Sequence, residues 1–148
     1  MKLNTPNPLQ VSKMWLRTTL LVWLCAFALM GSTTQARAQG PTVYKDWLIL
    51  GEDHANHIDV FYTVLKCSST SADQIHLKLF NENPSAKTTG FTVTVTDVAT
   101  NQSFTSQVSN FQLGVGAIVM ADCLANPSLR IDLPAGYNPN NLNVTITF

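Results

Sequence analysis

The chain has 148 residues, nine of them basic and nine acidic, so its formal net charge is zero. All nine acidic residues lie after residue 38, where only five of the nine basic residues remain, so that part of the chain carries a net charge of −4. It has no basic cluster that would release counterions from a phosphate backbone, which argues against nucleic acids and anionic membrane surfaces as partners.

The first 38 residues contain the three parts of a secretory signal peptide. These are the basic residues Lys2, Lys13 and Arg17, the apolar run from Leu20 to Met30, and the A-x-A cleavage site Ala36-Arg37-Ala38. The apolar run has eleven residues, fewer than the roughly 20 that a membrane-spanning helix needs. We therefore expect a signal peptide over residues 1–38, one domain without a transmembrane span over residues 39–148, and export to the periplasm or the extracellular space. A lipoprotein is the alternative because Cys25 lies in the apolar run, but the bulky Leu24 stands where a lipobox has a small residue.

Removal of the signal peptide leaves two cysteines, Cys67 and Cys123. In an oxidising compartment, two cysteines without a C-x-x-C spacing indicate one disulfide. The two positions are 56 residues apart, and closing a loop of this size would stabilise the fold by about 4 kcal/mol in the chain-entropy description. Ligation of a metal by the pair is the alternative interpretation.

From Gly40 onward, apolar and polar residues alternate with the period of β-strands. Strands are expected at residues 44–50, 57–67, 73–80, 91–97, 103–108, 111–123, 129–133 and 142–148, with a polar loop at residues 51–56. Turn residues separate these segments at intervals of roughly ten residues. The pattern predicts an all-β fold, an antiparallel immunoglobulin-like β-sandwich of about eight strands without helices.

The run from Ile58 to Cys67 is apolar on both of its faces. This predicts a strand that is covered on both sides, or one whose second face lies in a contact. The run from Phe111 to Cys123 also ends in a cysteine, so a disulfide would join the two longest predicted strands. If Cys67 faces inward, strict alternation turns Asp59 inward as well, and an unpaired buried carboxylate is costly. We therefore expect a bulge in this strand or an edge position for Asp59.

The segment Ile75-His-Leu-Lys-Leu-Phe-Asn-Glu-Asn-Pro84 follows one cysteine, and the other cysteine follows a glycine-containing strand. In this arrangement the chain resembles a group of small secreted proteins of Bacteroidota, which pair a strand ending in cysteine with an asparagine-containing turn and a later cysteine. The resemblance covers about two thirds of residues 39–148. It implies a small disulfide-linked β-sandwich and carries over no catalytic residue.

One stretch is dense in side chains that ligate metals, the segment from Glu52 to Asp59. Two histidines three residues apart beside carboxylates offer donors that suit zinc or copper. The candidate ligands are Asp53, His54, His57 and Asp59. The alternative is a solvated loop that precedes a strand.

The sequence contains no pattern of catalytic residues. It has neither a G-x-S-x-G nor an H-E-x-x-H motif, and oxidised cysteines cannot act as nucleophiles. We therefore expect no enzymatic activity and no cofactor other than the candidate zinc or copper. Trp47 is expected in the core, whereas Tyr137, in a loop rich in proline and asparagine, is expected to be exposed and to contact a ligand or partner.

Together these observations favour a non-catalytic exported module that binds or assembles with a protein or glycan partner in the envelope or outside the cell. A periplasmic metal-binding protein that uses residues 52–59 is one alternative. A fibre or adhesin subunit that assembles by strand exchange is another, because unpaired sheet edges recruit strands.

Overall fold

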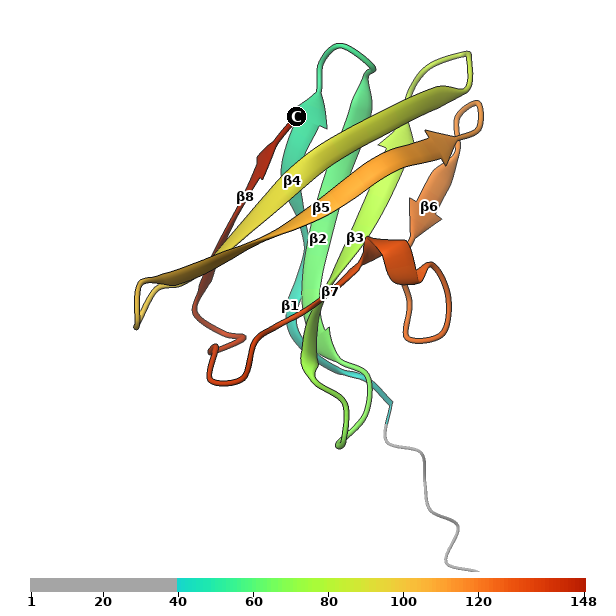
Figure 1. The fold of residues 1–148 in the computed structure, drawn as a ribbon. Coiled ribbons are helices and arrows are strands. Elements are labelled where there is room, and N and C mark those ends of the chain that lie inside the picture. Colours follow the sequence, from blue (N-terminus) through green and yellow to red (C-terminus); the bar gives the residue numbers. More distant parts are fainter. Residues whose placement is uncertain (1–39) are drawn as a thin grey trace, which may run out of the picture. The chain divides into compact units, whose positions relative to one another are not determined.

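The computed structural model describes residues 40–148 (Figure 1), so the predicted signal peptide lies outside the described part of the chain. This part contains eight strands. They are β1 (Thr42–Asp53), β2 (Ile58–Lys66), β3 (Asp73–Asn81), β4 (Lys87–Asp97), β5 (Gln102–Leu113), β6 (Ile118–Met120), β7 (Arg130–Asp132) and β8 (Leu142–Thr147). Every strand pairing is antiparallel, which confirms the predicted all-β antiparallel fold.

The strands form two sheets that lie one over the other (Figure 1). The first sheet has the strand order β1-β2-β3-β6, with β7 also paired to β3, and is called here the β2 sheet. The second has the order β5-β4-β8 and is called the β4 sheet. In Figure 1, β4 and β5 cross in front of the strands of the β2 sheet.

Alternation along the strands builds the core between the two sheets. Alternation along residues 73–80 and 91–97 predicts six inward residues, and each of them is buried, which confirms the prediction: Ile75, Leu77, Leu79, Phe91, Val93 and Val95. Burying one such aliphatic or aromatic side chain stabilises the fold by about 1.5–3 kcal/mol. The core residues of the three central strands are Ile58, Val60, Tyr62 and Val64 of β2, Ile75, Leu77 and Leu79 of β3, and Phe91, Val93 and Val95 of β4.

The prediction of one long strand over residues 111–123 is wrong. Residues 111–113 extend β5, residues 114–117 form a turn, and only the short strand β6 then pairs with β3. Gly116 has a φ of 58° in this turn, a conformation that costs glycine little. Cys123 therefore lies in the loop after β6, and the cysteine pair does not join the two longest strands.

The β4–β5 hairpin is fixed by the carboxylate of Asp97. This carboxylate accepts backbone N–H hydrogen bonds from Asn138 at 2.8 Å, Thr100 at 3.0 Å and Ala99 at 2.8 Å. The N–H groups of Asn138, Thr100 and Ala99 hold the pKa of Asp97 below its usual range, because they stabilise the charged form. The hairpin is thereby tied to the loop that precedes β8.

Helical structure in residues 40–148 is limited to a three-residue 3-10 turn, η1 (Pro127–Leu129). Nothing helical in this part of the chain has the length and apolar character that a membrane crossing requires. The turn leads directly into β7, which pairs with β3 beside the position of the disulfide.

Candidate functional site

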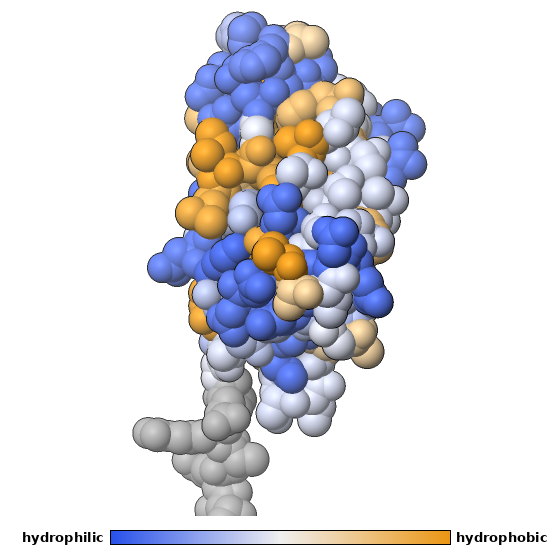
Figure 2. All heavy atoms as spheres, turned by 90° about the vertical axis from the view of Figure 1, so that its left-hand side faces the viewer, coloured by the Kyte–Doolittle hydropathy of each residue, from blue (hydrophilic) through white to orange (hydrophobic). Residues whose placement is uncertain are grey.

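The outer face of the β2 sheet, which points away from the β4 sheet, is largely apolar. Its apolar residues are Val43, Trp47 and Ile49 of β1, Phe61 and Leu65 of β2, Phe80 of β3, and Ile118 and Met120 of β6. Ile49 is 65% exposed and Ile118 is 59% exposed. Figure 2 views the edge of the sandwich on the side where β8 lies in Figure 1, and apolar side chains also gather in the upper half of this edge. Exposed apolar residues gathered on one face make that face a candidate contact surface.

The cation of Lys78 lies within this outer face, beside two aromatic rings. The Lys78 Nζ atom is 5.0 Å from the centre of the Trp47 ring and 4.3 Å from the centre of the Phe61 ring. Aromatic ring faces attract a cation at such distances. Trp47 therefore belongs to the outer face, and the prediction that it lies in the core is wrong.

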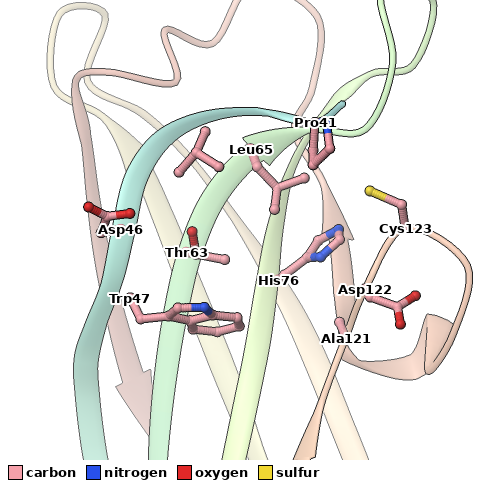
Figure 3. Close-up of a pocket in the computed structure, with 10 residues that line it drawn as sticks. Pro41, Asp46, Trp47, Thr63, Leu65, His76, Ala121, Asp122 and Cys123 are labelled. Atoms are coloured by element: carbon pink, nitrogen blue, oxygen red, sulfur yellow. The ribbon is translucent and has the colours of Figure 1, made fainter. Parts of the chain in front are cut away.

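A pocket of about 180 Å³ opens on the outer face beside the disulfide (Figure 3). Figure 3 shows Trp47, Thr63 and His76 projecting from the same side of three neighbouring strands. The residues that line the pocket are Pro41, Val43, Asp46 and Trp47 near β1, Thr63 and Leu65 of β2, His76 of β3, and Ala121, Asp122 and Cys123 after β6. The pocket therefore lies at the end of the outer face that borders the disulfide.

Cys67 and Cys123 form the predicted disulfide, with Cα atoms 5.6 Å apart. The bond links the end of β2 to the loop after β6. Alternation along β2 places Asp59 and Cys67 together on the outer face, because the core residues Ile58 and Val64 occupy the other face. Cys67 therefore does not face inward, and Asp59, which is half-buried, needs neither a bulge in β2 nor an edge position to avoid the core.

His76 lies beside the disulfide and is only 1% exposed. Its Nε2 atom is 3.0 Å from Gln74 Oε1 and 3.9 Å from Cys67 Sγ. Burial, and then the charge of Arg130, lowers the pKa of His76, so the imidazole is neutral at pH 7. Alternation predicted that His76 faces away from the core, which is correct, but the loop after β6 buries the ring.

The candidate metal ligands at residues 52–59 lie at the β1–β2 turn. The predicted loop is shorter than expected because β1 continues to Asp53. The imidazoles of His54 and His57 both lie beside the carboxylate of Glu52. The distance from Nδ1 to the nearer carboxylate oxygen is 3.2 Å for His54 and 3.8 Å for His57. Asp53 is buried and accepts hydrogen bonds within the domain, while Asp59 pairs with Glu52 across the strands. Metal binding at this turn stays a prediction, with Glu52 better placed than Asp53.

Tyr137 is not the exposed ring that the sequence predicted. It packs edge-on against Phe104, with ring centres 5.5 Å apart, and rests on the core. Its role as a ligand or partner contact stays a prediction.

Within residues 40–148, one group of three cysteine, histidine or acidic residues has converging donor atoms. The group consists of Cys67, His76 and Cys123, whose ligand atoms lie within 4.8 Å of one another. His76 is not among the site residues predicted from the sequence. The sequence places Cys67 at the end of β2 and His76 early in β3, so these two residues could have been expected to lie close together. The position of the loop that carries Cys123 cannot be predicted from the spacing of nearby residues.

Comparisons of this chain with protein-family models, with curated proteins and with solved structures find no match.

Proposed function

We propose that this chain is an exported, non-catalytic binding module that holds a protein partner against the outer face of its β2 sheet. The domain that carries this face is immunoglobulin-like in the broad sense of two packed antiparallel sheets. The observation that supports the proposal is the apolar outer face itself, where Val43, Ile49, Ile118 and Met120 are all strongly exposed.

The chemistry of the outer face favours a protein partner over a glycan. Glycan sites depend on aromatic rings that stack on sugars, whereas most of the exposed apolar area here comes from aliphatic side chains. Apolar and aromatic residues with few charges form the centre of protein interfaces. Lys78, held between Trp47 and Phe61, supplies one positive charge that would orient a partner carrying an acidic group.

Affinity capture from extracts of the envelope in which the chain is produced tests the proposal. The tagged chain is expected to retain a protein that the Ile49→Thr/Ile118→Thr double variant loses. The matched control is a Thr94→Ser/Thr105→Ser double variant, which alters the outer face of the β4 sheet. Equal capture by all three chains would contradict binding through the β2 sheet.

A metal-binding role at the β1–β2 turn is the second candidate, because Glu52 contacts both His54 and His57. Under this hypothesis the purified chain carries stoichiometric zinc or copper that a His54→Ala/His57→Ala variant lacks. Equal, substoichiometric metal in both chains would remove this candidate.

A further inference from the structure

Four atoms that could ligate a metal ion lie close together at the end of the outer face that borders the disulfide. They are the two sulfurs of Cys67 and Cys123, Nε2 of His76 and Oε1 of Gln74. The Gln74 oxygen is 3.3 Å from Cys67 Sγ and 3.0 Å from His76 Nε2. The amide of Gln74 is held in this orientation because its Nε2 donates a hydrogen bond to Asp132 Oδ1 at 2.6 Å.

The imidazole of His76 is positioned as metal-ligating histidines are. The backbone carbonyl of Ala121 hydrogen-bonds the ring, and a carbonyl of this kind commonly fixes the tautomer of a ligating histidine. A neutral imidazole has one N–H. In the oxidised chain Nε2 carries this N–H and donates it to Gln74 Oε1 at 3.0 Å, because an amide oxygen can only accept. A metal bound at Nε2 would take the place of that proton, which would then reside on the other ring nitrogen.

The distances among these atoms match a tetrahedral zinc site. Zinc binds sulfur at about 2.3 Å and nitrogen or oxygen at about 2.0–2.2 Å, so neighbouring ligands in a tetrahedron are roughly 3.2–3.8 Å apart. The N–O, S–O and S–N separations of 3.0, 3.3 and 3.9 Å lie at or near this range. The two sulfurs are closer together than ligands of one metal, because they are bonded to each other, and the ligand atoms of Cys67, His76 and Cys123 all lie within 4.8 Å of one another.

We infer that reduction of the Cys67–Cys123 disulfide converts this cluster into a Zn²⁺ site with Cys67, Cys123 and His76 as ligands and Gln74 as the fourth. A dithiol supplies the two electrons and two protons: its thiolate attacks one sulfur, its second thiol releases the mixed disulfide, and the dithiol leaves as a disulfide. Zn²⁺ then binds both sulfurs and displaces their two protons. Two sulfurs with one nitrogen and one oxygen are donors that suit zinc.

Both the dithiol and Zn²⁺ can reach the two cysteines. Cys67 and Cys123 are half-buried rather than enclosed, and Cys123 lines the pocket that opens on the outer face (Figure 3). Cys123 lies in a loop, so its sulfur can move away from Cys67 without displacing a strand. Arg130, whose Nη1 donates to the Cys123 carbonyl at 3.1 Å, steadies that loop.

The test titrates the full chain carrying Cys25→Ser, so that two cysteines remain, with Zn²⁺ and with Co²⁺ as a spectroscopic probe. Oxidised protein is compared with protein reduced by a dithiol that is then removed under argon, and circular dichroism monitors the β-sheet signal. The reduced protein is expected to bind one equivalent, with thiolate-to-cobalt charge-transfer absorption that the oxidised protein lacks. Affinity is expected to rise with pH because the thiols must lose their protons.

Two variants separate this site from other sites in the chain. His76→Gln, which keeps a polar side chain of similar size, is expected to weaken binding by at least about tenfold, in line with the losses that even supporting residues of metal sites produce. The His54→Ala/His57→Ala variant is expected to bind as the parent does. Equal binding by oxidised and reduced protein, unchanged binding by His76→Gln, loss of binding in the His54→Ala/His57→Ala variant, or unfolding of the reduced chain in the presence of Zn²⁺ would each overturn the inference.

Discussion

The two sheets of this domain share one core but have opposite outer faces. The outer face of the β4 sheet is polar and uncharged along three strands, with Thr92, Thr94 and Thr96 of β4, Ser103, Thr105 and Gln107 of β5, and Asn143, Thr145 and Thr147 of β8. The outer face of the β2 sheet carries exposed aliphatic and aromatic side chains in many of the corresponding positions, together with polar residues such as Thr63, Gln74 and Lys78. Both sheets contribute buried residues to the core between them, so the core does not require the second apolar face.

The difference between the two outer faces singles out the β2 sheet as the one whose exposed residues are not explained by folding stability. An antiparallel sheet with one solvated face normally alternates apolar and polar residues, as β4 does. Strand β2 does not alternate in this way, since Phe61 and Leu65 on its outer face are as apolar as its core residues. The pocket, His76 and the disulfide lie on the same outer face, so the unusual chemistry of the domain is concentrated there.

The largest expected effect concerns the disulfide, which belongs to the β2 sheet alone. Replacing both Cys67 and Cys123 by serine is expected to lower the free energy of unfolding by about 4 kcal/mol, because the unfolded chain regains the entropy of an open loop. Denaturant unfolding of the variant and the parent measures this loss. A change below roughly 1 kcal/mol would show that the bond does little to constrain the unfolded chain.

The next effect concerns the edge where the two sheets meet. A Cβ atom on Gly51 of β1 would lie 2.7 Å from Ile146 Cγ2 and 3.6 Å from Phe148 of the β4 sheet side. Gly51→Ala is therefore expected to cost about 1–3 kcal/mol through overcrowding. Gly114→Ala is the control, since its nearest neighbour would be an ordinary contact at 3.8 Å. Equal thermal stability of the two variants would contradict the close approach of β1 and β8.

The pH dependence of stability should reflect the carboxylate that anchors the β4 hairpin. The N–H donors of Asn138, Thr100 and Ala99 lower the pKa of Asp97 in the folded state, so its contribution is present above the unfolded pKa of about 3.9 and is lost as pH falls through the folded value. Asp97→Asn is expected to unfold at a lower temperature than the parent at neutral pH.

That gap between Asp97→Asn and the parent should narrow as pH falls through the lowered pKa of Asp97 in the folded chain, because the parent carboxyl is then also protonated. Asp46→Asn, which alters an exposed carboxylate, serves as the control and should show no such change. An equal difference in unfolding temperature at neutral and acidic pH would mean that the charge of Asp97 does not stabilise the hairpin.

The smallest effect on stability is expected at the apolar outer face. Ile49→Thr and Ile118→Thr replace exposed side chains and should change the free energy of unfolding by no more than about 0.5 kcal/mol. The same substitutions should reduce the binding of a hydrophobic fluorescent dye by the folded domain, whereas Thr94→Ser on the β4 sheet should not. Strong destabilisation by Ile49→Thr would show that this face is part of the folding core instead.

Much of this fold was accessible from the sequence, because strand periodicity and cysteine number are local properties. The alternation of β3 and β4 identified the core residues on both strands, and the two apolar faces of β2 already indicated a second contact. The break between β5 and β6 was missed, since a turn at Gly116 depends on backbone conformation rather than on hydropathy.

The misplacement of Trp47 has a different cause. The pairing of β1 with β2 shifts register at three places between Val43 and Gly51, and each β-bulge changes the face to which the following side chains point. Simple alternation therefore fails in β1. The cysteine and histidine cluster was missed because its third member is brought in by a loop whose path is set by tertiary contacts.

Site-specific photo-crosslinking in cells that produce the chain tests the role of the outer face most directly. A photoreactive amino acid is placed at Ile49 or Ile118 on the β2 sheet, and at Thr94 or Thr105 on the β4 sheet as controls. The account predicts one discrete protein adduct from the first two positions and none from the controls. Adducts of equal yield from both sheets, or from the controls alone, would contradict it.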